Sequence, residues 1–77
     1  MFIRDKQNTV SNTVRAARMA RSMTQEELAQ NVHATRQTII AIEKGNYVPS
    51  VLLALKIAAV LNGKVEDLFE ISNYEKN

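Results

Sequence analysis

Cysteine is absent from this chain of 77 residues, which excludes disulfides and thiolate metal sites and makes a reducing cytoplasm the expected compartment. A single histidine, His33, has no second His or Cys to form a metal site with it, so neither a metal nor a cofactor is expected. Two glycines and one proline stand where helices are expected to end, and no linker or repeat is visible. These absences favour one compact domain.

Long apolar runs are absent too. The longest one, residues 51–61, contains Lys56 and is too short to span a bilayer, and the N-terminal MFIRDKQNTV is too polar for a signal peptide. We therefore expect a cytoplasmic protein without a membrane role. Residues 1–44 hold seven Lys and Arg against four Asp and Glu, and the remainder three against four, which favours a nucleic-acid partner only slightly.

The spacing of apolar residues and the placement of capping residues predict five helices. Thr24 and Glu27 form a capping-box pattern, and Asn12, Thr35 and Ser50 are the other expected N-caps. Gly45 and the pair Asn62-Gly63 are typical of helix ends. The expected helices are 12–22, 25–32, 35–44, 51–61 and 65–69.

The second and third helices are separated only by His33 and Ala34, so they must approach closely. A small residue, Ala29, is expected where they meet, and larger apolar residues fill the wedge between them: Leu28, Val32, Ile39 and Ile42. This arrangement predicts a helix-turn-helix over residues 25–44.

The segments TQEELAQNVHATRQTIIAIEKG, PSVLLALKIAAVL and VEDLF resemble the lambda-repressor/Cro-like (XRE) helix-turn-helix family of small bacterial or phage regulators, over roughly residues 12–69. The resemblance implies an all-α, five-helix DNA-binding domain at 12–69, preceded by an arm at 1–11 and followed by a tail at 70–77. His33 departs from the family's usual glycine, which takes a left-handed conformation there; histidine tolerates that conformation better than most residues. Met1–Lys6 and Glu70–Tyr74 contain β-prone residues that either pair as a small sheet or fray.

The resemblance implies double-stranded DNA as the partner, with residues 35–44 as a recognition helix in the major groove. Arg suits guanine and Gln suits adenine, and an apolar side chain suits the thymine methyl group. For Ile40, packing within the protein is the alternative. The expected base-reading residues are Arg36, Gln37, Ile40 and Ala41.

Gln25 begins the second helix, whose N-terminus attracts phosphate. The other candidates for contact with the DNA backbone are Thr35, Lys44, Asn46 and Tyr47; for Asn46 a plain turn role, and for Tyr47 packing at the rim, remain equally open. Arg18 and Glu43 resemble the family's partly buried ion pair and are expected to be structural.

The helix expected at 51–61 is apolar nearly all round, which favours a partner on its outer face. Val51, Leu55, Ala58 and Leu61 are expected to face the core, and Leu52, Leu53 and Val60 a second copy. We therefore expect a nucleoid-associated homodimer that binds a pseudo-palindromic operator, more in keeping with a repressor than an activator, without a small-molecule ligand. A protein-interaction module such as an antitoxin is the alternative.

An enzyme is not expected, because Glu26 and Glu27 point about 100° apart on a helix.

Overall fold

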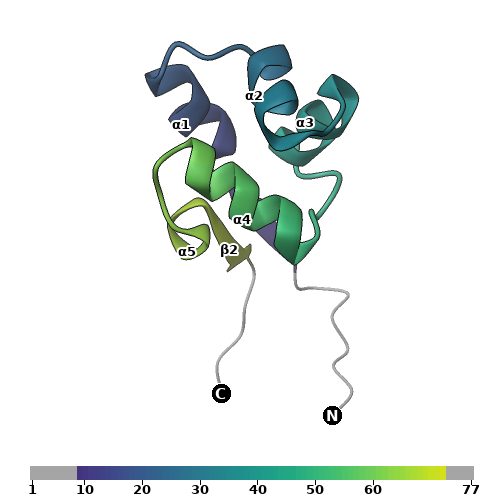
Figure 1. Cartoon of the computed structure of the whole chain (residues 1–77). Helices are drawn as coiled ribbons and strands as arrows, with labels where there is room; N and C mark the ends of the chain where they lie inside the picture. Colours follow the sequence, from purple (N-terminus) through teal and green to yellow (C-terminus); the bar gives the residue numbers. More distant parts are fainter. Residues whose placement is uncertain (1–8, 73–77) are drawn as a thin grey trace, which may run out of the picture.

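The computed structural model describes residues 9–72, which form five helices and a two-stranded antiparallel sheet (Figure 1). The fold class expected from the sequence, five helices with a small pairing of strands, is confirmed. None of the helices in this part of the chain is long and apolar enough to cross a membrane. The elements are β1 Thr9–Asn12, α1 Val14–Ala20, α2 Gln25–Val32, α3 Arg36–Glu43, α4 Val51–Val60, α5 Val65–Leu68 and β2 Phe69–Ser72.

Side-chain caps begin three of the helices as expected. Thr24 Oγ1 accepts a hydrogen bond from the Glu27 backbone N–H at 3.0 Å, and the Glu27 carboxylate accepts one from the Thr24 N–H at 2.8 Å. Thr35 and Ser50 cap α3 and α4 in the same direction, each accepting from the backbone three residues later. These bonds satisfy donors that a helix leaves free at its first turn.

The start of α1 differs from the expectation. Thr13 is the residue at the N-cap position, whereas Asn12 belongs to β1. Asn12 still supplies the capping oxygen, because its Oδ1 accepts from the Val14 N–H at 3.1 Å and its Nδ2 donates to the Ile42 carbonyl at 2.8 Å. One side chain thus ties the strand, the start of α1 and the end of α3 together.

Two of the expected turns rely on non-glycine residues in the left-handed region. His33 has φ 60° between α2 and α3, and the N–H of Ala34 donates back to the Ala29 carbonyl at 2.9 Å. After α4, Asn62 rather than Gly63 takes the positive φ, at 59°. The tight turn expected at His33 is therefore confirmed.

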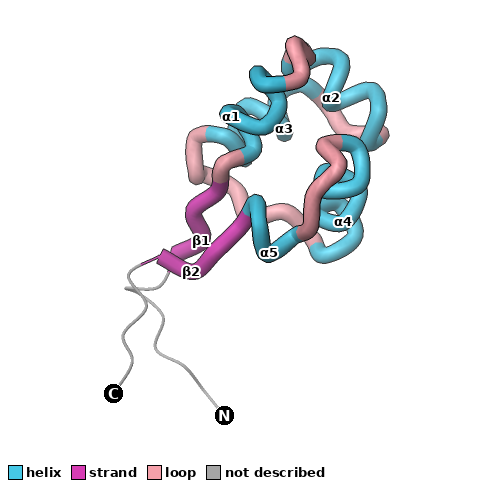
Figure 2. The backbone as a smooth tube through the Cα atoms, turned by 90° about the vertical axis from the view of Figure 1, so that its left-hand side faces the viewer, coloured by secondary structure: helices cyan, strands magenta, loops and turns pink. Residues whose placement is uncertain are grey.

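The two strands bring the ends of the described chain side by side (Figure 2). Thr9 pairs with Ser72 and Asn12 with Phe69. The expected pairing of terminal segments is thus confirmed for the C-terminal side, but its partner is Thr9–Asn12; the other expected partner, Met1–Lys6, lies outside the described residues. The expected last helix also ends at Leu68, because Phe69 already belongs to β2.

The core forms around α2, which packs against both α3 and α4. The five residues expected to build the helix-turn-helix are all at most 1% exposed: Leu28, Ala29, Val32, Ile39 and Ile42. Val14, Ile57, Ala58, Leu61 and Leu68 complete the cluster.

The expected rotation of α4 is partly wrong. Its buried residues are Ala54, Ile57 and Ala58, followed by Leu61, whereas Val51 is 76% and Leu55 54% exposed. Leu53 and Val60, expected at a dimer interface, are half-buried and pack partly against the core. A helix that is apolar on every side carries no periodic signal to fix which face turns inward.

Candidate DNA interface

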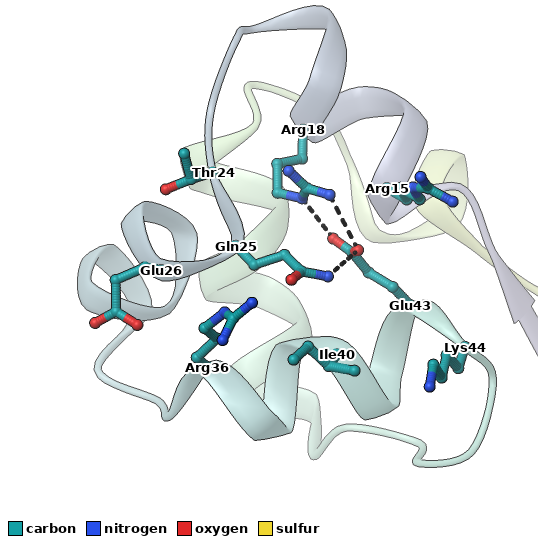
Figure 3. A pocket seen from close by; sticks show the side chains of 9 residues that line it. All are labelled: Arg15, Arg18, Thr24, Gln25, Glu26, Arg36, Ile40, Glu43 and Lys44. Carbon is teal, nitrogen blue, oxygen red and sulfur yellow. Dashed lines mark hydrogen bonds and ion pairs between the residues drawn. The ribbon is translucent and has the colours of Figure 1, made fainter.

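A groove of about 450 Å³ lies between α1, the start of α2, and α3 (Figure 3). Its lining combines four cations, two carboxylates and three other residues: Arg15, Arg18, Arg36, Lys44, Glu26, Glu43, Thr24, Gln25 and Ile40. The groove thus has an excess of positive charge, and the N-terminus of α2, with its positive dipole end, opens into it.

An ion pair joins α1 to the last residue of α3 in this groove. Arg18 Nε donates to Glu43 Oε2 at 2.7 Å and Arg18 Nη2 donates to Glu43 Oε1 at 3.2 Å. The third guanidinium nitrogen, Nη1, donates to the Met23 carbonyl at 2.6 Å. With side chains only 9% and 3% exposed, the pair holds the end of α3 to α1.

Gln25 extends this network toward the solvent. As the first residue of α2, it places its amide in the groove, where Nε2 donates to Glu43 Oε1 at 3.1 Å. A carboxylate can only accept, so this contact orients the amide with its nitrogen toward Glu43. The second hydrogen on that nitrogen remains available to another acceptor.

The expected base-reading residues all lie on α3, but they differ in how exposed their side chains are. Arg36 and Gln37 are exposed at its N-terminus. Ile40 and Ala41 are half-buried; Ile40 lines the groove, while the Ala41 carbonyl accepts from the Asn46 N–H at 2.9 Å. The outer face of α3 thus presents two exposed polar side chains, Arg36 and Gln37, and one partly accessible apolar side chain, Ile40.

The expected backbone-contacting residues surround α3. Thr35 and Thr38 share a hydrogen bond between their hydroxyls at 2.9 Å, beside the exposed Arg36. Lys44 follows α3 at its C-cap and lines the groove. Asn46 and Tyr47 are exposed in the loop between α3 and α4, outside the groove.

Arg15 is a groove residue that the sequence alone does not single out. It lies three residues before Arg18 on α1, so the two side chains share a helix face. That relation would have identified Arg15 once Arg18 was known to pair with Glu43 of α3. In residues 9–72, Arg18 and Glu43 form the only ion pair, which leaves the exposed Arg15 guanidinium without an acidic partner there.

Comparisons with known proteins identify the class. The family model described as helix-turn-helix matches residues 14–68. An uncharacterized HTH-type transcriptional regulator of Archaeoglobus fulgidus is 50% identical over 62 residues, covering 80% of this chain and 89% of the relative. The uncharacterized HTH-type transcriptional regulator YgzD of Bacillus subtilis is 50% identical over 60 residues, covering 78% and 91%.

Solved structures share the fold. A candidate DNA-binding protein from Bacteroides fragilis superposes with a TM-score of 0.73 at 21% identity, covering 80% of this chain and 100% of that one. The clp gene regulator ClgR from Corynebacterium glutamicum gives 0.67 at 24% identity, covering 70% and 57%. The family model and the curated relatives place the chain among helix-turn-helix transcriptional regulators, and the solved structures share its fold. The chain belongs to the XRE-type helix-turn-helix family.

Proposed function

We propose that this protein is a sequence-specific transcriptional repressor that binds a pseudo-palindromic operator as a dimer, with α3 in the major groove. The observation that carries the proposal is the position of Arg36: it is exposed at the N-terminus of α3 and lines a groove in which cations outnumber carboxylates. A helix with polar residues at its N-terminus, beside a cationic groove, can meet base edges and phosphates together.

Base readout is assigned to the outer face of α3. Arg36 is suited to the O6 and N7 acceptors of guanine, and Gln37 to the N6 and N7 groups of adenine. Ile40, half-buried in the groove, is suited to a thymine methyl group, and Ala41 contributes only a small apolar surface beside it. Specificity should therefore depend most on the two exposed polar residues.

Backbone contacts are assigned to both sides of α3. On the groove side, Gln25 offers its free amide hydrogen and Lys44 its ammonium group. Thr35 supports the start of the helix, and we assign further phosphate contacts to the exposed Asn46 and Tyr47 in the following loop. Such contacts fix the position of the helix but do not read sequence.

The second copy of the chain is assigned to the exposed side of α4. Leu52 is 63% exposed, and Val48, Val51 and Leu55 are also more than half exposed. Beside them lies an apolar groove of about 210 Å³ that includes Val48, Pro49 and Val51. Contiguous apolar surface of this kind marks an interaction site, and a two-fold dimer buries the same patch on both copies.

Repression follows from occupancy. A domain that fills the major groove at a promoter excludes other proteins from the same DNA, and this requires no activity beyond binding. The site of action would be the nucleoid.

Selection from random double-stranded DNA, followed by titration at several salt concentrations, tests the function. We expect an inverted repeat with half-sites about 34–36 Å apart, and affinity that falls steeply with salt. Arg36→Ala should weaken preference at one base pair by about 1–3 kcal/mol, whereas Lys64→Ala, an exposed control outside the groove, should not. Affinities of roughly 10⁻⁴–10⁻⁶ M for every sequence would refute the proposal and favour the protein-interaction alternative.

Sedimentation over a range of protein concentrations tests the dimer. Leu52→Glu should shift the wild-type dimer toward monomer without unfolding it, because the side chain is mostly exposed. Met19→Glu changes an equally apolar, 55% exposed residue of α1 and serves as the control. A dimer that resists Leu52→Glu and dissociates on Met19→Glu contradicts the assignment to α4.

A further inference from the structure

We propose that Arg15 of α1 is an additional DNA contact, whose guanidinium binds a phosphate on the same strand that Gln25 meets. This inference rests on the proposed function and extends its site from the helix-turn-helix to the first helix. It follows from the shape and the charge of the groove.

The groove runs along α3 between two walls. Arg36, Ile40 and Lys44 are four residues apart and form a row on one face of α3, which makes one wall. Gln25 from α2 and Arg15 from α1 belong to the opposite wall (Figure 3). Figure 3 shows Gln25 toward the Arg36 end of this row and Arg15 toward the Lys44 end.

The length of this row determines how many phosphates of one DNA strand can lie along the groove. Eight residues of α-helix separate Arg36 from Lys44, which is roughly 12 Å. One strand of DNA carries a phosphate about every 3.4 Å along the helix axis. A strand that meets Gln25 at one end therefore brings further phosphates to the other end, where Arg15 lies.

The charges in the groove support the same assignment. Glu43 is already bonded to Arg18 and Gln25, and Glu26 accepts a hydrogen bond from Gln30 Nε2 at 3.3 Å. Arg15 is exposed and has no acidic partner among residues 9–72. A guanidinium can offer two parallel N–H donors to a phosphate, so Arg15 is equipped for this contact without breaking any bond within residues 9–72.

The test compares Arg15→Gln with wild type on the selected operator and on random DNA, from 50 to 200 mM salt. Loss of one phosphate contact reduces the magnitude of the negative slope of log K against log salt by about 0.9. The ratio of wild-type to variant affinity should therefore shrink by about 3.5-fold across this range. The same factor should apply to both DNAs, because a phosphate contact reads no base.

Three further measurements keep the result interpretable. Arg15→Lys should restore the slope, since it restores the charge, and Lys64→Gln, an exposed cation outside the groove, should leave it unchanged. Thermal unfolding of Arg15→Gln should match wild type. An equal slope in wild type and Arg15→Gln, or an altered base preference, overturns this inference alone; wild-type binding that is independent of salt overturns the proposed function with it.

Discussion

Removing one partner of the Arg18–Glu43 pair should destabilise the domain more than any surface change. Arg18→Met keeps a long apolar side chain but leaves the Glu43 carboxylate, 3% exposed, with only the Gln25 amide as a partner. It also removes the donor to the Met23 carbonyl. Breaking a buried pair in this way costs about 3–5 kcal/mol. The whole free energy of unfolding for a chain of this length is about 4–12 kcal/mol.

Thermal and urea unfolding followed by circular dichroism measure the effect. The expected loss lowers Tm by roughly 12–40 °C, so the variant should unfold well below the wild-type midpoint. Arg15→Met removes an exposed arginine from the same helix and should change stability by less than about 0.5 kcal/mol. If Arg18→Met lies within about 1 kcal/mol of wild type, the pair behaves as a solvated surface pair and the buried pair does not hold α1 to α3 as we describe.

A double variant separates the cost of the unpaired Glu43 carboxylate from the cost of lost packing. Arg18→Met combined with Glu43→Leu removes both charges and leaves two apolar side chains of similar size at the junction of α1 and α3. Replacing both partners of a buried pair is often nearly neutral. The double variant should therefore be more stable than Arg18→Met alone, and a strictly additive loss would refute the interpretation.

Three other substitutions test the turns and the core, each by the shift in the unfolding midpoint. His33→Gly should stabilise the protein by roughly 0.5–1 kcal/mol, because glycine relieves the left-handed strain but loses more backbone entropy; destabilisation would mean that the imidazole makes an important contact. Ala29→Leu should cost about 1–3 kcal/mol by overpacking a site that is 1% exposed, and a neutral result would reveal spare volume. Asn12→Ala should cost about 1–2 kcal/mol through its two lost hydrogen bonds, whereas no loss would show that water replaces them.

Features determined by a few neighbouring residues could be predicted from the sequence. The Thr24–Glu27 capping box, the Thr35 cap and the left-handed turn at His33 all depend on short-range hydrogen bonds or on local sterics. The buried faces of α2 and α3 were equally predictable, because both helices alternate apolar and polar residues with a helical period.

Features set by tertiary packing could not be predicted in the same way. The apolar residues of α4 have no periodic pattern that shows which face of the helix is buried. The exposure of Val51 and Leu55 therefore depends on how α4 packs against α2 and α5. The strand Thr9–Asn12 has a weak pattern of its own and is defined by its partner. Arg15 likewise gains its place in the groove only when α1 packs against α3, a contact made far from it in sequence.

The position of Glu43 connects stability with DNA binding. A carboxylate on a surface proposed to face phosphates is unfavourable unless it is neutralised, and here Arg18 supplies two hydrogen bonds and Gln25 a third. The residue that fixes the end of α3 therefore also orients the amide assigned to a phosphate. Because one carboxylate serves both purposes, the ion pair does more than support the proposed recognition helix: it neutralises Glu43 where the proposal puts a negatively charged ligand.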